Sequence, residues 1–288
     1  MPELQQLDAH LDDVWARITE ERDARAARRS VPPLIRLWDG DWNIRGVVGG
    51  AIDYSFEWKL NDIGGGFIKL PHDHHLAKWA LDVHGRKTKN IHVTCDKDGA
   101  RWGGRLQSAT LVKNADGSRY VELKFLDDIK ELEHVLCWPN PFLPAAVQFP
   151  KSFVLVGPAR SMLKWTLFVN LIRLHGNFWQ LPDDILDPTT WFEGVTPWNW
   201  SIAVTPNSLL LDDSQWCVID TRMKNFMELA SPILADAGLM IVTRRWLLGD
   251  PRPEGWVGPL RNGQLLVDIV DKSGVFEQTA TSSTTPSS

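Results

Sequence analysis

Three histidines and an aspartate occupy four successive positions of the chain, His72, Asp73, His74 and His75. Imidazole and carboxylate groups bind transition metals, so the cluster raises the hypothesis of a metal site. A helical metal pair needs histidines four positions apart on one face, whereas His74 and His75 are adjacent and point in different directions. The surrounding sequence, LPHDHHLAKWAL, instead predicts a strand followed by a helix with Asp73 as its N-cap. We interpret the cluster as a strand-to-helix junction that holds no metal.

A second set of chemical groups lies in the acidic and aromatic segment LPDDILDPTTWFE, residues 181–193. Glycosidases place two carboxylates on either side of the scissile bond, and indole rings can stack on sugars. The carboxylates in question are Asp183, Asp184, Asp187 and Glu193. Acidic residues beside proline and threonine are also common in turns and caps, which is the interpretation that we favour.

The rest of the sequence contains no catalytic signature. It has no phosphate-binding loop, dinucleotide fingerprint, nucleophile elbow or zinc-protease helix. Its three cysteines, Cys95, Cys137 and Cys217, match no zinc spacing and are interpreted as buried free thiols. Cys95 lies within a predicted strand and Cys137 beside prolines, so neither has the surroundings of an activated nucleophile. We expect no enzymatic activity and no cofactor.

The overall composition narrows the class of protein. The chain has 288 residues, 43% of them hydrophobic, which is enough for two ordinary domains with their own cores. A formal net charge of −5, from 31 basic and 36 acidic residues, gives no electrostatic footprint for nucleic acid or an anionic membrane. No run approaches the roughly 20 apolar residues that span a bilayer, and the N-terminus does not resemble a secretory signal. We expect assembly in a cytoplasm.

Tryptophan is unusually frequent, with 15 Trp against 2 Tyr. Tryptophan is favoured in cores and as an anchor of protein interfaces, and it also stacks on sugars. Four tryptophans on periodic segments are expected in the core: Trp58, Trp79, Trp165 and Trp246. Three in the irregular segment after residue 190 are predicted to line an interface or a groove, in contact with protein or carbohydrate: Trp191, Trp198 and Trp200.

The chain opens with a predicted helix over residues 3–29, within an N-terminal segment 1–33 that ends in a Val-Pro-Pro sequence. Apolar residues recur along this helix at alternating spacings of three and four, which is typical of a coiled-coil seam of about two heptads. The seam residues are Leu4, Leu7, Leu11, Val14 and Ile18. The helix either docks on its own domain or packs against a partner helix.

A β-rich region follows at residues 34–136, where short runs alternate in polarity. Residues 52–58 predict a half-buried strand, and the glycines at 64–66 predict a bend or bulge before the next strand. Further strands are expected at 91–95, 101–112 and 120–125, with a hairpin turn at Asp116 and Gly117. Asp127 or Asp128 can cap a short helix.

The second half of the chain begins with a proline-rich connector, residues 137–157. An α+β region is predicted from 158 to 275: a strongly apolar helix from 158 to 175, a strand near 216–219, a helix from 222 to 237, and strands at 239–248 and 265–270. Residues 276–288 have the composition of a Ser/Thr-rich linker or tail. The predicted fold class is therefore α+β and rich in β structure.

Two stretches of the first region carry a resemblance. They are LIRLWDGDWNIRGVV and SFEWKLNDIGGGFIKLPHDHHLAKWAL, with the key positions at 34–39, 56–64 and 70–79. Their order is similar to that in the minor tail proteins of long-tailed phages that infect actinobacteria, in which an L-x-L-W-D strand, an F-x-W-K-L-N-x-x-G segment and an L-P-x-D-H-x-L-A-K-W segment follow one another. The match is specific over roughly the first hundred residues.

The resemblance implies a structural tail-tip hub subunit, built from tandem small β-barrel-like domains with an α+β insertion. Such a subunit would form a ring, with a trimer expected, at the tip of the virion tail. It would join the tail tube or distal ring to receptor-binding fibres and contact the tape measure protein, with roles in host attachment and DNA delivery. The alternative is a tail-associated protein that binds or degrades cell-wall carbohydrate, with a host surface glycan as ligand.

Overall fold

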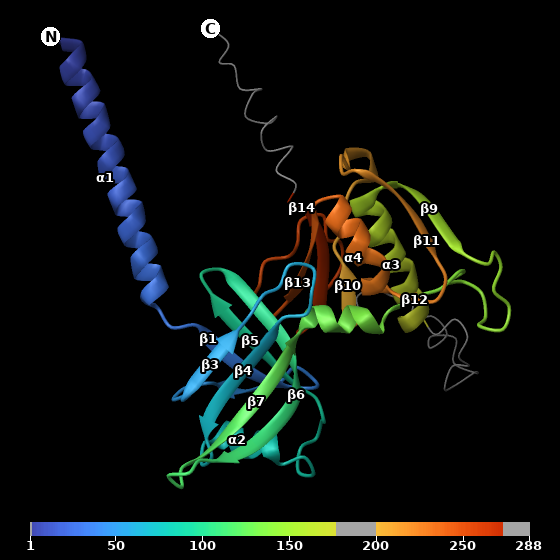
Figure 1. Cartoon of the computed structure of the whole chain (residues 1–288), viewed down its shortest axis with the longest axis horizontal. Helices are drawn as coiled ribbons and strands as arrows, with labels where there is room; N and C mark the ends of the chain where they lie inside the picture. Colours follow the sequence, from blue (N-terminus) through green and yellow to red (C-terminus); the bar gives the residue numbers. More distant parts are fainter. Residues whose placement is uncertain (1, 177–199, 273–288) are drawn as a thin grey trace.

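A computed structural model describes residues 2–176 and 200–272, with side chains from residue 13 onward (Figure 1). The N-terminal helix α1 (Pro2–Ser30) leads away from the body of the molecule. Its described side chains are exposed, apart from a partly covered Val14. At its base, the Lys97 ammonium donates to the carbonyl oxygens of Arg28 and Arg29, at 3.0 Å in each case. The predicted helix is confirmed, and beyond its base it projects away from the rest of the chain.

Seven antiparallel strands form the sheet of the first region, in the order β2-β1-β5-β6-β7-β4-β3. Register shifts interrupt β1 after Leu37 and β6 near Leu106, where the sheet bends. The strands are β1 (Leu34–Asp39), β2 (Ile44–Val47), β3 (Asp53–Phe56), β4 (Gly65–Pro71), β5 (Ile91–Lys97), β6 (Ala100–Lys113) and β7 (Arg119–Asp127).

Alternating polarity explains which face of this sheet is buried. In β7, Val121, Leu123 and Phe125 are at most 2% exposed, whereas the residues between them face outward. The short helix α2 (His75–Leu81) covers the buried face with Leu76 and its two alanines. These residues share one hydrophobic cluster, which we call the first core. One prediction was wrong in detail: β3 is an edge strand and mostly exposed, because it has only β4 as a neighbour.

The glycine run before β4 has a steric reason. A Cβ on Gly64 would lie 2.0 Å from the carbonyl oxygen of Glu57, so only glycine allows the two backbones to approach. The same carbonyl accepts a hydrogen bond from the Trp102 indole N–H at 3.0 Å, and that indole is fully buried. The predicted bend therefore lets the largest side chain of the first core fit beneath it.

The second region combines two helices with short strands. Two-stranded sheets pair β11 with β9 and β12 with β8, and a three-stranded sheet has the order β10-β14-β13. The elements are η1 (Asp128–His134), β8 (Leu136–Cys137), β9 (Phe153–Pro158), α3 (Ala159–His175), β10 (Ile202–Val204), η4 (Leu209–Leu211), β11 (Trp216–Thr221), β12 (Lys224–Asn225), α4 (Phe226–Asp236), β13 (Leu239–Arg245) and β14 (Leu265–Asp271).

A second core lies between α3, α4 and the three-stranded sheet (Figure 1). Fully buried Leu163, Leu167 and Leu171 of α3 recur every four residues and pack with Phe226 of α4. The helix predicted from residue 222 begins instead at Phe226, because the preceding residues pair with β8 as β12. Asn225 caps it by accepting the Glu228 amide at 2.7 Å. The predicted β-rich α+β class is confirmed.

The proline-rich segment between the cores is held in place by α3. The guanidinium of Arg173 lies 3.7 Å from the ring centre of Trp138 and donates to the carbonyls of Pro141 and Leu143 at 2.9 and 2.6 Å. Buried Asn170 accepts the Trp138 amide at 3.0 Å. The end of the predicted connector is not irregular, since residues from Phe153 onward form β9. Among the described residues, no helix is long and apolar enough to cross a membrane.

Candidate assembly surfaces

A group of buried charged and aromatic side chains joins the two cores, and we call it the joint. At its centre the Arg245 guanidinium of β13 donates two hydrogen bonds to the Asp128 carboxylate of η1, at 3.0 and 2.7 Å. The two side chains are 5% and 2% exposed. A third hydrogen bond reaches the Gly263 carbonyl at 3.0 Å. Two parallel bonds match the geometry of guanidinium and carboxylate and fix the orientation of the joint.

Aromatic rings complete the joint on the side of the first sheet. The Trp42 ring stacks on His92 with 4.6 Å between ring centres, and the Arg245 guanidinium lies 4.9 Å from the Trp42 centre. The Asn262 side chain donates to the Trp42 carbonyl at 2.9 Å. Burial, with the nearby Arg245 and Arg105 charges, lowers the pKa of His92 to about 3. The imidazole is therefore neutral at physiological pH.

Asp127 lies beside the joint and caps η1, accepting the Ile129 amide at 2.8 Å. This confirms the predicted cap. Burial raises the pKa of Asp127 to about 7, and the neighbouring Asp128 charge adds to the rise. A carboxyl with such a pKa is found in many acid–base catalysts. Here, however, the Asp127 carboxyl binds the Ile129 amide at the start of η1, and the charged side chains of the joint are paired with one another. We therefore assign Asp127 a structural role.

The histidine cluster is the strand-to-helix junction expected from its spacing. The cap residue is nevertheless His74 and not Asp73, because the His74 Nδ1 accepts the Leu76 amide at 3.2 Å. The other ring nitrogen lies 3.1 Å from the Gly49 carbonyl, and the His75 ring stacks 4.6 Å away. No group of three or more potential metal ligands occurs in the part of the chain that the structure describes.

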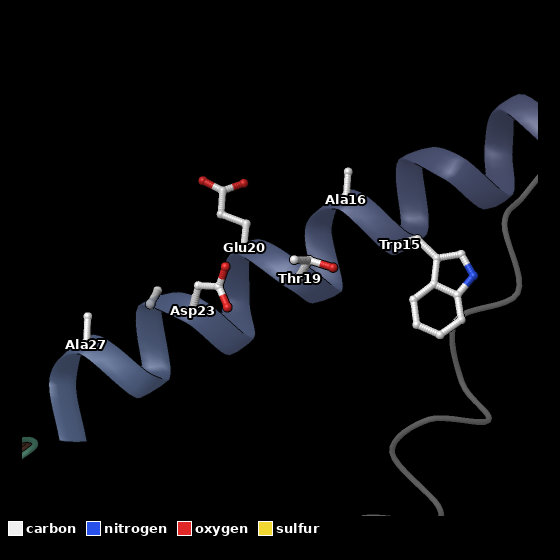
Figure 2. Close-up of a pocket in the computed structure, with 7 residues that line it drawn as sticks. Trp15, Ala16, Thr19, Glu20, Asp23 and Ala27 are labelled. Carbon is white, nitrogen blue, oxygen red and sulfur yellow. The ribbon is translucent and has the colours of Figure 1, made fainter. Parts of the chain in front are cut away.

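Two of the five predicted seam residues, Val14 and Ile18, have described side chains on α1. Ile18 is 49% exposed and Val14 is partly covered, while Leu4, Leu7 and Leu11 lie on the helix but their side chains are outside the described set. Figure 2 shows Trp15 pointing away from the α1 axis, with Ala16 directly after it and Thr19 about one turn further along the helix. The pocket at this place is lined by α1 residues alone, so it is helix surface and not an enclosed site.

The tryptophans do not all lie where the sequence predicts. Trp200 is 1% exposed and its ring stacks on His175 and contacts Phe168, each with 5.7 Å between centres, so its assignment to an interface was wrong. Its position just before β10 carries it into the second core. Trp191 and Trp198 lie outside the described residues, as do the carboxylates Asp183, Asp184, Asp187 and Glu193.

Two of the four predicted core tryptophans are instead on the surface. Trp58 is 57% exposed because it follows an edge strand, and Trp165 is 52% exposed because it lies on the outward face of α3. Trp246 is buried as predicted, and Trp79 packs against the first core.

The cysteines are free thiols in the structure, as predicted. Cys95 and Cys137 are buried, and burial raises their pKa to about 11 and about 12. Cys217 is partly buried, which also raises its pKa. The thiolate form that a nucleophile needs is therefore disfavoured at all three positions.

An apolar surface that sequence reasoning missed lies on the two-stranded ribbon of β9 and β11. Four outward side chains are 56% to 71% exposed: Val154, Val156, Trp216 and Val218. Beside β9, a groove of about 720 Å³ runs along α3, with Trp165 and Phe168 in its lining. Monomers rarely leave contiguous apolar area of this kind in water. The apolar run from Phe153 to Val156, rich in β-branched residues, was a signal for β9, but the nearby prolines favoured a connector.

Comparison with known proteins shows which family the sequence matches. The sequence profile of the family described as "Siphovirus ReqiPepy6 Gp37-like protein" matches residues 34–287. Minor tail protein Gp28 of Mycobacterium phage L5 is 36% identical over 286 residues, and minor tail protein Gp28 of Mycobacterium phage D29 is 36% identical over 289 residues. The alignments cover 93% and 94% of this chain but 48% of each relative, so the chain spans about half the length of these relatives.

A solved tail protein from Neisseria meningitidis MC58 aligns with 82% of this chain and 50% of its own, with a TM-score of 0.37 and 12% identity. The family match and the two relatives together support the class of siphovirus minor tail proteins. The chain belongs to the Siphovirus ReqiPepy6 Gp37-like family. The resemblance to minor tail proteins seen in the sequence is thereby confirmed.

Proposed function

We propose that the chain is a structural subunit of the tail-tip hub, where it links the tail tube or distal tail ring to receptor-binding components. The observation that carries the proposal is the exposed apolar surface on α1 and on the β9–β11 ribbon. α1 projects with Ile18 of the predicted seam and Trp15 exposed, and the β9–β11 ribbon exposes four large apolar side chains. Such surfaces have a physical use in a permanent assembly and are a liability in a free monomer.

The two cores support a division into two structural units. We propose a first unit over residues 34–136, centred on the seven-stranded sheet, and a second over 158–275, with residues 137–157 between them. At the end of the first unit, η1 packs Ile129 and Leu132 into the second core, so the two units share this element. Buried, bidentate contacts at the joint hold the units in one orientation. A hub subunit needs such rigidity, because it holds the attachment components in a fixed position relative to the tail tube.

In this proposal the subunit forms a ring, with three copies as the expected number. Its neighbours are the distal tail protein, other minor tail proteins and the tape measure protein, and its part in host attachment and DNA delivery is mechanical. The α1 seam, together with Trp191 and Trp198, is assigned to contacts with these neighbours. Catalysis has no place in this function.

Imaging of assembled particles tests the proposal. Particles whose copy of the chain carries an added affinity tag would be imaged by cryo-electron microscopy after labelling. We expect label at the tail tip, in a ring of copies around the tail axis. Label spread along the tube would overturn the hub assignment. Specific binding by the isolated chain on a glycan array would favour the alternative of a carbohydrate-binding tail protein.

A further inference from the structure

The β9–β11 ribbon has two open edges, and the hydrogen-bond register shows which backbone groups they offer. The strands are antiparallel, with Val218 opposite Val156 and Ile219 opposite Leu155. Just beyond the ribbon, the Ala159 amide donates to the Gln215 carbonyl at 2.9 Å. In an antiparallel pair, hydrogen-bonded and non-hydrogen-bonded positions alternate. Leu155 and Ile219 therefore bond across the ribbon.

The residues between these positions direct their backbone groups away from the partner strand. On β9 these are Val154 and Val156, and on β11 they are Trp216, Val218 and Asp220. Pro158 falls in the same non-bonded set, where its missing N–H leaves no partner unsatisfied, and this agrees with the assignment. Among the described residues, no hydrogen bond occupies the outward amides of Val154, Val156 or Val218.

Natural sheets protect such edges with charges, prolines, bulges or a covering segment. The β9 edge has none of these at Val154 and Val156, and it borders the apolar groove along α3. The β11 edge combines the exposed Trp216 and Val218 with one carboxylate, at Asp220. Both edges belong to strands of six residues, so each can serve as the partner of the other.

We propose that these two edges pair between copies: β11 of one subunit adds to the free edge of β9 in the next subunit. Each copy then supplies one edge and accepts one edge, which is the head-to-tail contact that closes into a ring. Backbone hydrogen bonds give the contact its strength, and the apolar side chains of the added strand cover Val156 and the groove along α3. The inference deepens the proposed function, on which its closure into a ring rests.

Edge-blocking variants of the full chain test this pairing. In Val156→Pro the substitution removes an amide that faces outward, so the in-chain ladder of β9 is retained while addition is blocked. Val218→Pro does the same on β11. Val156→Thr keeps both the amide and the β-branched shape and is the matched control. Should the proline variant fail to fold by circular dichroism, Val156→Lys blocks the same edge with a charge.

Association is measured by light scattering across a concentration series. We expect the wild-type chain and Val156→Thr to oligomerise, and each proline variant to associate about a hundredfold more weakly. An equimolar mixture of the two proline variants retains one intact β9 edge and one intact β11 edge. It should therefore form dimers that neither variant forms alone and that grow no further, which no symmetric contact predicts.

Amide hydrogen exchange at single residues provides an independent readout. In the oligomer, the amides of Val154, Val156 and Val218 should become as slow to exchange as those of Leu155 and Ile219, which are already bonded within the ribbon. An oligomer in which the three amides still exchange rapidly would overturn the pairing and leave the hub function standing. A chain that stays monomeric at every concentration overturns self-pairing and makes another tail protein the occupant. Loss of association in Val156→Pro alone indicates symmetric β9 pairing instead.

Discussion

The joint and the β9–β11 ribbon both adjoin the second core but differ in chemistry. In the joint, charged groups are buried and bind one another, as the bidentate pair of Arg245 and Asp128 shows. In the ribbon, apolar side chains are exposed and backbone donors have no partner within the described chain. Buried charges with matched partners indicate a contact made permanently within one chain. Exposed valines beside an open strand edge indicate a contact that requires another chain.

The largest effect is expected from breaking the central pair of the joint. Arg245→Ala leaves the Asp128 carboxylate buried without its partner, which typically costs about 3 to 5 kcal/mol in the free energy of unfolding. The neighbouring Arg244 is exposed on the same strand, so Arg244→Ala should change stability by less than about 0.5 kcal/mol. Denaturant unfolding measures both.

Replacing both Arg245 and Asp128 tests whether the cost comes from leaving one buried charge without a partner. In the double variant Arg245→Met with Asp128→Leu, no charge is left buried, so much of the lost stability should return. If Arg245→Ala costs no more than Arg244→Ala, the joint is not the rigid contact that the proposed hub requires.

A second, smaller effect concerns the pH dependence of stability. The folded pKa of Asp127, about 7, exceeds its unfolded value of 3.8, so this group favours folding at low pH and loses that contribution as pH rises through 7. His92 has a folded pKa of about 3 against 6.5, so its contribution is present above pH 6.5 and is lost as pH falls. Between pH 4 and 6.5 the two contributions oppose each other.

The variant Asp127→Asn should separate the contributions of Asp127 and His92 to the pH dependence, because asparagine keeps the helix cap but cannot titrate. In this variant the free energy of unfolding should rise between pH 4 and 6.5 by up to about 1.4 kcal/mol per pH unit, the slope that one proton allows. The wild-type slope should be much flatter. Denaturant titrations at a series of pH values give both slopes, and equal slopes would show that Asp127 does not bind its extra proton in the folded chain.

The sequence was most informative where a pattern was local. The α1 helix, the strands β5 to β7, the Asp127 cap and the buried α3 all follow from periodicity and capping residues within a short window. Contacts between distant segments gave no such pattern. Nothing near Arg245 indicates Asp128 as its partner, 117 positions away. Trp165 and Trp200 show the same limit. Trp165 was predicted to lie in the core and is exposed, whereas Trp200 was predicted to lie at an interface and is buried in the core.

A modest effect is expected at the start of α2, where the cap differs from the predicted one. His74→Ala removes the ring nitrogen that accepts the Leu76 amide and should lower the free energy of unfolding by about 0.5 to 1 kcal/mol. Asp73→Ala is the matched control and should cost less, because Asp73 does not cap the helix. The reverse order would restore the sequence-based assignment. Neither variant should change the zinc or iron content of purified particles, since the cluster is expected to hold no metal.

The smallest effect on folding, with a large effect on assembly, is expected on α1. Ile18 continues the seam of Leu7 and Leu11 and is 49% exposed, so Ile18→Asp removes little buried surface and should change the free energy of unfolding by less than about 0.5 kcal/mol. If the seam packs against a neighbouring chain, the same aspartate must be desolvated there, which costs several kcal/mol and should prevent tail completion. Ala16→Asp places an equal charge on another face of the same helix, since residues two positions apart do not share a face, and should leave tails intact. The double change Leu7→Asp with Leu11→Asp should act like Ile18→Asp, because all three positions share one seam. Counting complete tails by electron microscopy shows whether the seam packs against a neighbouring chain. Normal tails from Ile18→Asp would mean that α1 has no partner along this seam. The β9–β11 ribbon would then remain as the proposed contact between subunits.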